Sequence, residues 1–250
     1  MKKMMGSMIV ATLLLTFGVT GFAAEPTGLK VELMPYLWYA GLEGDLTINN
    51  TKYEFSKSPE DLFESVSVAG SFLAVLQYNR FLLWYQGDYF KRSTDEFDNH
   101  PEHASIDSTM LINEVAVGYQ IDGFFEGQTF DLMIGGRFLN MENELKIAGQ
   151  PDRSRDVNLA DPMLVIRPSI PLFPSYIKGL RFNPTLAIGG GGDSELVFEL
   201  FPQIQYQFTD HIAMRIGYRT VGYKLKGENN DDNELNLRLA GLIVGIGGIF

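Results

Sequence analysis

Apolar and polar residues alternate along much of this 250-residue chain, in blocks of about ten residues. In the block 81–89, every second position is apolar or glycine, whereas the positions between them include Trp84, Gln86 and Asp88. The blocks 130–138, 180–188, 196–208 and 212–218 repeat this arrangement, and none of the five apolar faces carries a charge. A period of two predicts β-strands with one apolar and one polar side, and no helical period accounts for it.

The alternation predicts an all-β fold, an antiparallel up-and-down transmembrane β-barrel of about ten strands. The strands are expected at residues 30–41, 66–78, 81–92, 108–121, 129–141, 158–170, 180–190, 196–208, 211–223 and 235–250. Short turns then lie at one end (79–80, 122–128, 171–179 and 209–210), and longer polar loops lie at the other (42–65, 93–107, 142–157, 191–195 and 224–234). This asymmetry is typical of an outer-membrane barrel, whose short turns face the periplasm. Eight or twelve strands are also compatible, since Asp45–Phe55 could pair as an extra hairpin.

The N-terminal residues have the layout of a secretory signal peptide. Lys2 and Lys3 precede the apolar run 8–19, and small residues follow it up to Ala24. The alternative, a membrane anchor, needs a longer apolar run of roughly 18–20 residues. We therefore predict that residues 1–24 form the signal peptide and that residues 25–250 form the barrel.

Composition narrows the classes of function. The formal net charge of −11 argues against a nucleic-acid-binding protein, which needs a basic surface. The chain has no cysteine, which excludes disulfides, thiolate metal sites and cysteine nucleophiles. Its three histidines are too few for a histidine-rich zinc site, and no cofactor or metal is expected. An exported chain without cysteine fits the bacterial periplasm or outer membrane.

A soluble β-sandwich or lipocalin-like barrel also alternates, but its apolar face points inward. Aromatic residues at the predicted strand ends favour the membrane barrel, because such residues form girdles at the two membrane interfaces. On the periplasmic side they are Tyr78, Phe81, Tyr119, Phe124, Phe125, Phe173, Tyr176, Phe208 and Phe250, and on the outer side Trp38, Tyr39, Tyr89, Phe90, Phe138, Phe198, Tyr218 and Tyr223. The amphipathic last strand, which ends on Phe250, resembles the C-terminal signal that the barrel-assembly machinery recognises.

Several short motifs are distributed over most of the chain after the signal peptide. They are Pro35-Tyr36-Leu37-Trp38, Gly41-Leu42-Glu43-Gly44-Asp45, Glu60-Asp61-Leu62-Phe63, Gly189–Ser194, Gly217-Tyr218-Arg219 and Gly241–Phe250. With these motifs the chain resembles a family of small, porin-like outer-membrane β-barrel proteins of Gram-negative bacteria. The resemblance implies an outer-membrane location among lipid and a barrel fold, and it brings no catalytic residues.

The polar faces of the predicted strands would point into the barrel. The charged residues on these faces are Glu32, Asp88, Glu114, Asp131, Asp161 and Glu199, with Arg137, Arg167, Arg181, Arg215 and Arg219. Because six acids nearly balance five arginines, we interpret them as a structural network of ion pairs that fills a narrow lumen. The alternative is a narrow pore that is lined by these charges and passes small solutes.

Some local features qualify this picture. Ser58-Pro59-Glu60-Asp61 has the features of a helix start. A short helix here could form a lid over the mouth of the barrel or, as we favour, one ordered turn of the loop.

The acidic loop 228–234 lacks the spacing of an EF-hand, so a solvated loop is favoured over a cation site. Gly189–Gly192 suits a tight bend at the rim. Pro35, Pro168, Pro184 and Pro202 fall within predicted strands, where each removes a ladder donor, so bulges or breaks are expected.

Some outer-membrane barrels are enzymes, and two classes of them have motifs that bear on this chain. Omptin-type proteases need Asp-x-Asp and Asp-x-His pairs at the outer rim, whereas Asp210-His211 is adjacent in sequence and falls in a periplasmic turn. His103-Ala104-Ser105, with Glu114 nearby, has the His-x-Ser spacing of lipid A deacylase barrels. A three-residue match is weak and His103 lies in an acidic loop, so a solvated histidine is favoured and no enzyme activity is expected.

Overall fold

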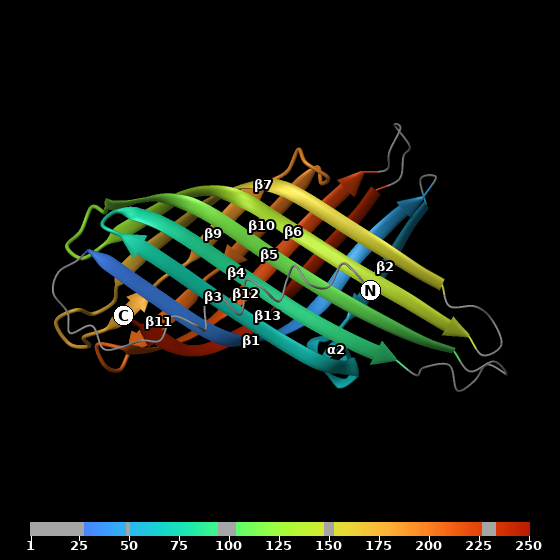
Figure 1. Cartoon of the computed structure of the whole chain (residues 1–250), viewed down its shortest axis with the longest axis horizontal. Coiled ribbons are helices and arrows are strands. Elements are labelled where there is room, and N and C mark those ends of the chain that lie inside the picture. Colours follow the sequence, from blue (N-terminus) through green and yellow to red (C-terminus); the bar gives the residue numbers. More distant parts are fainter. Residues whose placement is uncertain (1–27, 49–50, 95–103, 148–152, 227–233) are drawn as a thin grey trace.

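The computed structural model describes residues 28–48, 51–94, 104–147, 153–226 and 234–250. The expected signal peptide, His103 and most of the acidic loop 228–234 lie outside these residues. The described chain forms one antiparallel sheet that closes on itself as a barrel, together with a single short helix (Figure 1). No helix among the described residues is long and apolar enough to cross a membrane.

Strands that follow one another in the chain are also neighbours in the barrel, which is the up-and-down arrangement. They are β1 (Leu29–Ile48), β2 (Thr51–Lys57), β3 (Val66–Tyr78), β4 (Phe81–Thr94), β5 (Ala104–Asp122), β6 (Thr129–Ile147), β7 (Arg153–Pro171), β8 (Leu180–Phe182), β9 (Thr185–Gly189), β10 (Leu196–Phe201), β11 (Gln203–Gln207), β12 (Ile212–Lys226) and β13 (Glu234–Ile249). β13 closes the ring by pairing with β1. β8 with β9, and β10 with β11, each form one barrel strand, and β2 pairs with β1 off the ring. The described chain therefore has ten barrel strands, and the predicted fold class is confirmed.

Two of the four prolines placed in strands interrupt them. Asn183 and Pro184 separate β8 from β9, and Pro202 separates β10 from β11, because proline cannot donate to the ladder. The wall stays closed beside these breaks, where the Asn183 amide donates to the Gln203 carbonyl at 2.9 Å. The other two prolines, Pro35 and Pro168, lie within the continuous strands β1 and β7.

Side chains alternate between the outside and the inside of the barrel. On β6, Ile134 is 66% exposed on the outer face, whereas its neighbour Met133 is 1% exposed on the inner face. Each barrel strand presents at least one such outward apolar residue: Leu37, Leu76, Leu83, Val117, Ile134, Leu164, Ile188, Leu200, Ile216 and Val244. The apolar rows therefore face outward around the whole ring, which is the reverse of a soluble barrel.

Three aromatic residues expected in the outer girdle point inward instead. Trp38 and Tyr223 are each 3% exposed, and Phe90 packs against the buried interior. Strict alternation explains the correction for Trp38, because its chain neighbours Leu37 and Tyr39 are exposed on the outer face.

The strands are longer than expected at the end opposite the short turns. The described parts of the expected loops 93–107 and 142–157 are strand, so those loop boundaries were wrong. Beyond the apolar rows, polar pairs across neighbouring strands continue the ladder. For example, Lys146 Nζ lies 2.7 Å from Asp107 Oδ2, and this hydrogen bond is the main cause that raises the pKa of Lys146.

β1 and β2 form the extra hairpin that the sequence left open, with Gly44 opposite Phe55. On one edge, β1 pairs with β3 from its start to Tyr36 and with β2 from Leu42 onward. Helix α2 (Pro59–Ser65) follows β2 and packs beside β1 at this seam. There the ring of Phe63 meets that of Tyr39 edge-on at 5.3 Å, on the outer wall of the barrel rather than over its mouth.

The start of α2 lies where the sequence predicts it. The Ser58 hydroxyl accepts a hydrogen bond from the Asp61 amide, and the Asp61 carboxylate accepts one from the Ser58 amide, both at 3.1 Å. This reciprocal cap satisfies two backbone donors that the first helical turn leaves free. Hydrogen bonds from Ser58 also lower the pKa of Asp61.

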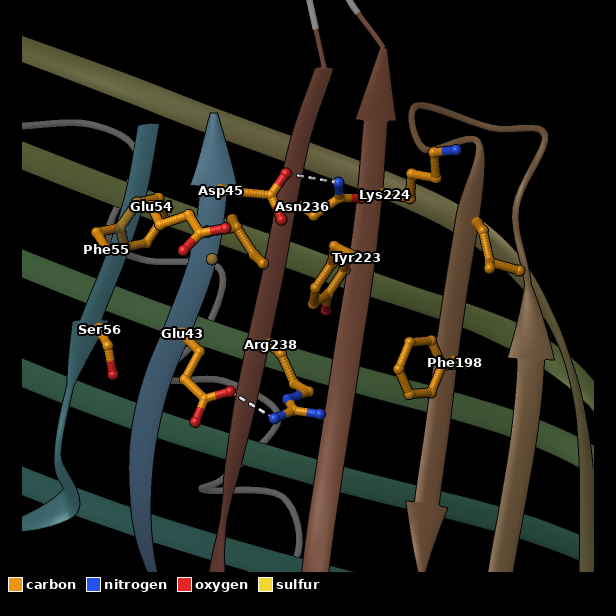
Figure 2. A pocket seen from close by; sticks show the side chains of 13 residues that line it. Glu43, Asp45, Glu54, Phe55, Ser56, Phe198, Tyr223, Lys224, Asn236 and Arg238 are labelled. Carbon is orange, nitrogen blue, oxygen red and sulfur yellow. Dashed lines mark hydrogen bonds and ion pairs between the residues drawn. The ribbon is translucent and has the colours of Figure 1, made fainter. Parts of the chain in front are cut away.

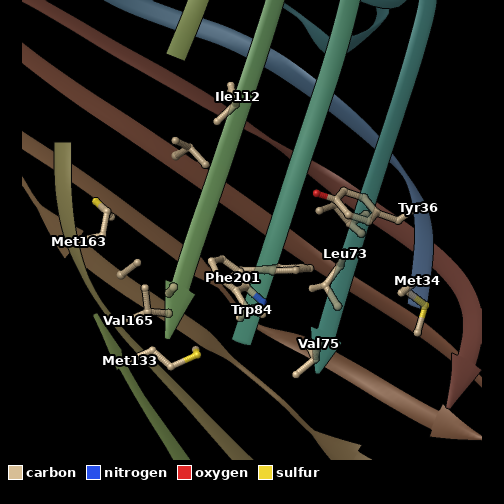
Figure 3. Close-up of a cluster of buried hydrophobic side chains, with 14 of the residues drawn as sticks. Met34, Tyr36, Leu73, Val75, Trp84, Ile112, Met133, Met163, Val165 and Phe201 are labelled. Carbon is tan, nitrogen blue, oxygen red and sulfur yellow. The ribbon is translucent and has the colours of Figure 1, made fainter. Parts of the chain in front are cut away.

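Apolar side chains pack the barrel interior between its polar groups. Figure 3 shows one such cluster, in which Trp84 and Phe201 lie close together among methionine and branched aliphatic side chains from the surrounding strands. Its labelled members are Met34, Tyr36, Leu73, Val75, Trp84, Ile112, Met133, Met163, Val165 and Phe201. All of these are almost completely buried, so the described barrel is filled at this level rather than open.

Candidate functional site: the barrel interior

The central ion-pair cluster joins five charged side chains, each from a different strand. Arg137 Nη2 on β6 lies 2.5 Å from Glu114 Oε2 on β5 and 2.6 Å from Glu199 Oε2 on β10. Arg219 on β12 reaches the same Glu199 oxygen at 2.9 Å and Asp88 Oδ2 on β4 at 2.6 Å. These five side chains are at most 1% exposed. The cluster therefore crosses the barrel and ties together strands that are not neighbours.

Uncharged side chains complete the surroundings of Arg219. Tyr36 Oη donates to Asp88 Oδ1 at 2.8 Å, and the guanidinium carbon of Arg219 lies 4.5 Å from the centre of the Trp38 ring. With its side-chain oxygen turned toward Arg219, the Gln86 amide accepts hydrogen bonds of 2.7–3.0 Å from the guanidinium nitrogens of Arg219. Charge-assisted bonds and the cation–π contact both hold this guanidinium in place.

A second group of charges lies nearer the short turns. Arg215 pairs with Glu32, and its Nε donates to Gln205 Oε1 at 2.8 Å. Arg167 lies 4.0 Å from Asp131, which is an ion pair but too long for a hydrogen bond. This second group therefore combines a close ion pair, a hydrogen bond to a neutral amide and one long ion pair.

The remaining two of the eleven predicted lumen residues bind neutral groups. Asp161 accepts from the Ser194 amide and hydroxyl at 2.8 and 2.7 Å. This anchors the glycine-rich turn after β9, where Gly190 and Gly191 have positive φ, as expected for a tight bend at the rim. Arg181 donates to Ser169 Oγ and to the carbonyl of Gly127, both at 2.7 Å. The other nine predicted residues all take part in ion pairs.

A cavity of about 650 Å³ opens at the end of the barrel that carries the short turns. We call it the short-turn cavity. Its charged lining residues are Lys30, Glu32, Asp131, Arg167, Arg181 and Arg215. The second group of charges thus faces this cavity, whereas no residue of the central cluster lines it.

At the opposite end, a second cavity of about 700 Å³ lies across β12, β13, β1 and β2 (Figure 2). Arg238 on β13 pairs with Glu43 on β1, and Asn236 donates to Asp45 at 3.0 Å. Lys224 lies 3.4 Å from Glu195 and 3.6 Å from Glu234. These charges are satisfied by each other and are partly or fully exposed.

Of the expected His-x-Ser motif and its acidic partner, the structure describes Ser105 and Glu114, and it does not bring these two together. Ser105 lies on β5 opposite Lys146, and Glu114 is nine residues further along the same strand, or roughly 30 Å away. Glu114 is held by Arg137 inside the barrel. His211 sits in the turn before β12, where its ring stacks on that of Phe250 at 6.1 Å. Among the described residues no group of three or more histidines and carboxylates is placed to hold a metal ion.

Sequence reasoning missed two members of the interior, Tyr36 and Trp38. They share the inner face of β1 with Glu32, four and six residues further along, so alternation alone could have found them. Gln86, two residues before Asp88, already belongs to the expected polar face of the block 81–89, and it is buried on the inner face of β4. No feature of the sequence, however, indicated that β12 and β4 meet across the barrel.

No protein-family model matches the chain, and no curated protein matches it. Similar solved structures include the translocator domain of the autotransporter NalP from Neisseria meningitidis, with a TM-score of 0.42, 11% identity, and 97% of this chain and 95% of that chain covered. The attachment invasion locus protein Ail of Yersinia pestis has a TM-score of 0.39 and 7% identity over 89% of this chain and 99% of that one. The outer membrane protein OprG from Pseudomonas aeruginosa has a TM-score of 0.32 and 10% identity over 90% and 96%. Because all three TM-scores lie below 0.5, the barrel assignment rests on the strand pairing and not on these likenesses.

Proposed function

We propose that this protein is an integral β-barrel of the bacterial outer membrane, and that its role is structural or porin-like with a lumen closed by the central ion-pair cluster. The observation that carries the proposal is the reversal of faces: isoleucine and leucine rows point outward while arginines and carboxylates meet inside. A soluble protein rarely exposes a continuous apolar surface of this extent, and a lipid bilayer requires one.

The dimensions of the apolar surface fit a membrane. On β6 the outward apolar row runs from Phe130 to Phe138, which spans eight residue steps or about 26 Å of strand. A strand tilt of roughly 40° reduces this to about 20 Å along the barrel axis, close to the ~25 Å apolar band of outer-membrane barrels. At the short-turn end, exposed rings such as those of Phe81 and Tyr119 meet at 5.3 Å and suit the interface.

The first experiment tests the location. The mature chain is expected to fractionate with outer membranes, to require detergent for extraction, and to change its mobility on gels when it is heated. A mature chain that stays monodisperse in buffer without detergent would contradict the proposal.

The second experiment tests closure of the lumen. Purified protein in planar lipid bilayers is expected to give no regular single-channel steps, because the central cluster and the buried apolar side chains around it occupy the described barrel interior. Regular steps from the unmodified protein would favour the alternative, a narrow channel for small solutes. That alternative draws support from the short-turn cavity, which brings polar groups part of the way into the barrel.

Two further expectations belong to this proposal. Phe250 pairs its backbone with Val31 through two hydrogen bonds of 2.8 Å, which places the chain end at the closing seam between β13 and β1. We therefore propose that Phe250 is read by the barrel-assembly machinery while that seam is still open. The proposal includes no catalytic activity: Ser105→Ala is expected to leave lipid composition unchanged, and a change would refute this part.

A further inference from the structure

The short-turn cavity carries an excess of positive charge in a strongly acidic protein. Four cationic side chains line it, Lys30, Arg167, Arg181 and Arg215, against two carboxylates, Glu32 and Asp131. The chain as a whole has a formal charge of −11. Local positive charge of this kind, set in a concave site, attracts anions.

Among the three arginines of the cavity, Arg167 uses the least of its hydrogen-bonding capacity. Its side chain is 9% exposed, and its nearest carboxylate, Asp131, stands 4.0 Å away. Asp131 is instead hydrogen-bonded by Gln120 at 2.8 Å. Within the described part of the chain no hydrogen bond to the guanidinium of Arg167 is found, and its Nη1 is buried without a partner. A buried guanidinium with five donors is costly to leave in this state.

The neighbours of Arg167 in the cavity contribute further donors. Arg215 is 4% exposed and forms an ion pair with Glu32. Its Nη1, however, is also buried without a hydrogen-bond partner among the described residues. Arg181 is bound by neutral oxygens of Ser169 and Gly127, and no carboxylate among the described residues pairs with it. Two buried arginines and one half-buried arginine therefore line one cavity with fewer acids than they could bind.

We propose that the short-turn cavity binds a small oxyanion-bearing solute, a phosphate or a carboxylate, with Arg167 as the main ligand and Arg181 and Arg215 beside it. The planar fork of arginine matches the paired oxygens of both groups. A volume of about 650 Å³ falls in the range of small-molecule sites, so a solute larger than the bare ion also fits. This site does not depend on whether the central cluster closes the lumen.

Trp84 offers a direct readout. The guanidinium carbon of Arg167 lies 6.0 Å from the centre of its ring, and the chain contains only two tryptophans. Trp38→Phe removes the other one, which packs on Arg219 away from the cavity. The fluorescence emission of Trp84 should then change when an anion binds to Arg167.

The experiment uses the folded full-length mature protein carrying Trp38→Phe, in detergent at constant ionic strength. It is titrated with inorganic phosphate, a dicarboxylate (succinate), a sugar phosphate and, as reference, chloride. We expect a saturable change in Trp84 emission with at least one oxyanion and none with chloride, and the ranking of the three tells phosphate from carboxylate. Arg167→Gln should weaken binding at least tenfold, whereas Arg167→Lys should retain part of it.

Arg80→Gln is the matched control. Arg80 lies in a short turn at the same end, is exposed, and pairs with Asp122 at 2.6 Å, so its loss should change the affinity less than twofold. Each variant is first checked for heat-modifiable gel mobility, which reports a folded barrel. Equal responses to chloride and to the oxyanions, no response at all, or equal weakening by Arg80→Gln and Arg167→Gln would overturn the proposal.

Discussion

Replacing Arg219 with glutamine should destabilise the barrel more than replacing any single carboxylate of the central ion-pair cluster. In the native cluster two arginines face three carboxylates, and Arg219 supplies the contacts of 2.6 and 2.9 Å to Asp88 and Glu199. Arg219→Gln leaves Arg137 alone against three buried carboxylates. Because these groups are at most 1% exposed, water does not compensate for the lost charge.

The magnitude follows from what each variant leaves behind. Removing one partner from a buried ion pair costs about 3–5 kcal/mol, so Arg219→Gln should lower the free energy of unfolding by that amount. Asp88→Asn leaves two arginines facing two carboxylates, and the asparagine oxygen can still accept from Tyr36. It should cost about 1.5 kcal/mol, the lower end of the range for a hydrogen bond to a charged group.

The assay is equilibrium unfolding in urea of barrels refolded into lipid vesicles, followed by tryptophan emission and gel mobility. A difference of 3–5 kcal/mol between Arg219→Gln and the native protein changes the unfolding equilibrium constant by roughly two to four orders of magnitude. The double variant Arg219→Gln/Asp88→Asn removes the one carboxylate that loses its arginine partner, since Glu199 keeps its contact with Arg137. It should therefore be more stable than Arg219→Gln alone.

Two outcomes would refute this reasoning. If Arg219→Gln costs less than about 1 kcal/mol, the cluster is not buried and paired as described, because breaking a buried pair costs far more. If the double variant is less stable than Arg219→Gln by the full cost of Asp88→Asn, the two residues are not coupled.

Other predictions test the membrane face, the helix cap and the chain end. Ile134→Arg, on the outer face of β6, should lower the free energy of unfolding in lipid vesicles by roughly 2–4 kcal/mol. Glu142→Arg, further along the same face, should lower it by almost nothing. Equal losses in the two variants would contradict a lipid-facing row. Ser58→Ala removes the cap of α2, worth about 0.5–2 kcal/mol, and should speed proteolysis between β2 and β3 without unfolding the barrel. Ser58 lowers the pKa of Asp61, so the cap stabilises the helix fully above the unfolded pKa of that carboxyl and loses this effect as the pH falls through the folded pKa. Cleavage of the native protein should therefore become faster in acid, and cleavage of Ser58→Ala should change less. Deleting Phe250 should slow assembly in cells severalfold while leaving refolding in vitro nearly unchanged; an equal slowing in both would point to the lost contacts with Val31 and His211 instead.

The centre of each strand could be predicted from the sequence because lipid imposes one requirement there. Every second residue must be apolar, as in the rows that contain Leu83 and Ile134, and this requirement fixes the inner face as well. Beyond the apolar rows the requirement disappears. Lys146 and Asp107 pair across the ladder in segments whose polarity resembles that of loops, so the strand ends were misplaced.

The members of the interior could be predicted, but their partners could not. Alternation assigns Arg219 and Asp88 to the inner face, and applied strictly it also assigns Trp38 there, which the expectation of an aromatic girdle obscured. Which arginine meets which carboxylate depends on how the barrel closes. β12 and β4 are separated in the ring by β13, β1 and β3, and no local pattern in the sequence specifies that contact.

This contact across the ring also bears on how the strand register is fixed. If β12 slipped by one residue against its neighbours, Arg215 and Arg219 would turn to the lipid side, at a cost of roughly 2–4 kcal/mol each near the midplane. A slip of two residues keeps every side chain on its own face, so the apolar rows alone do not oppose it. Such a slip would, however, move Arg219 by about 6–7 Å along its strand and separate it from Asp88 and Glu199. The central ion-pair cluster therefore distinguishes registers that the hydrophobic pattern leaves equivalent, which is a physical reason to place charges in the middle of a barrel.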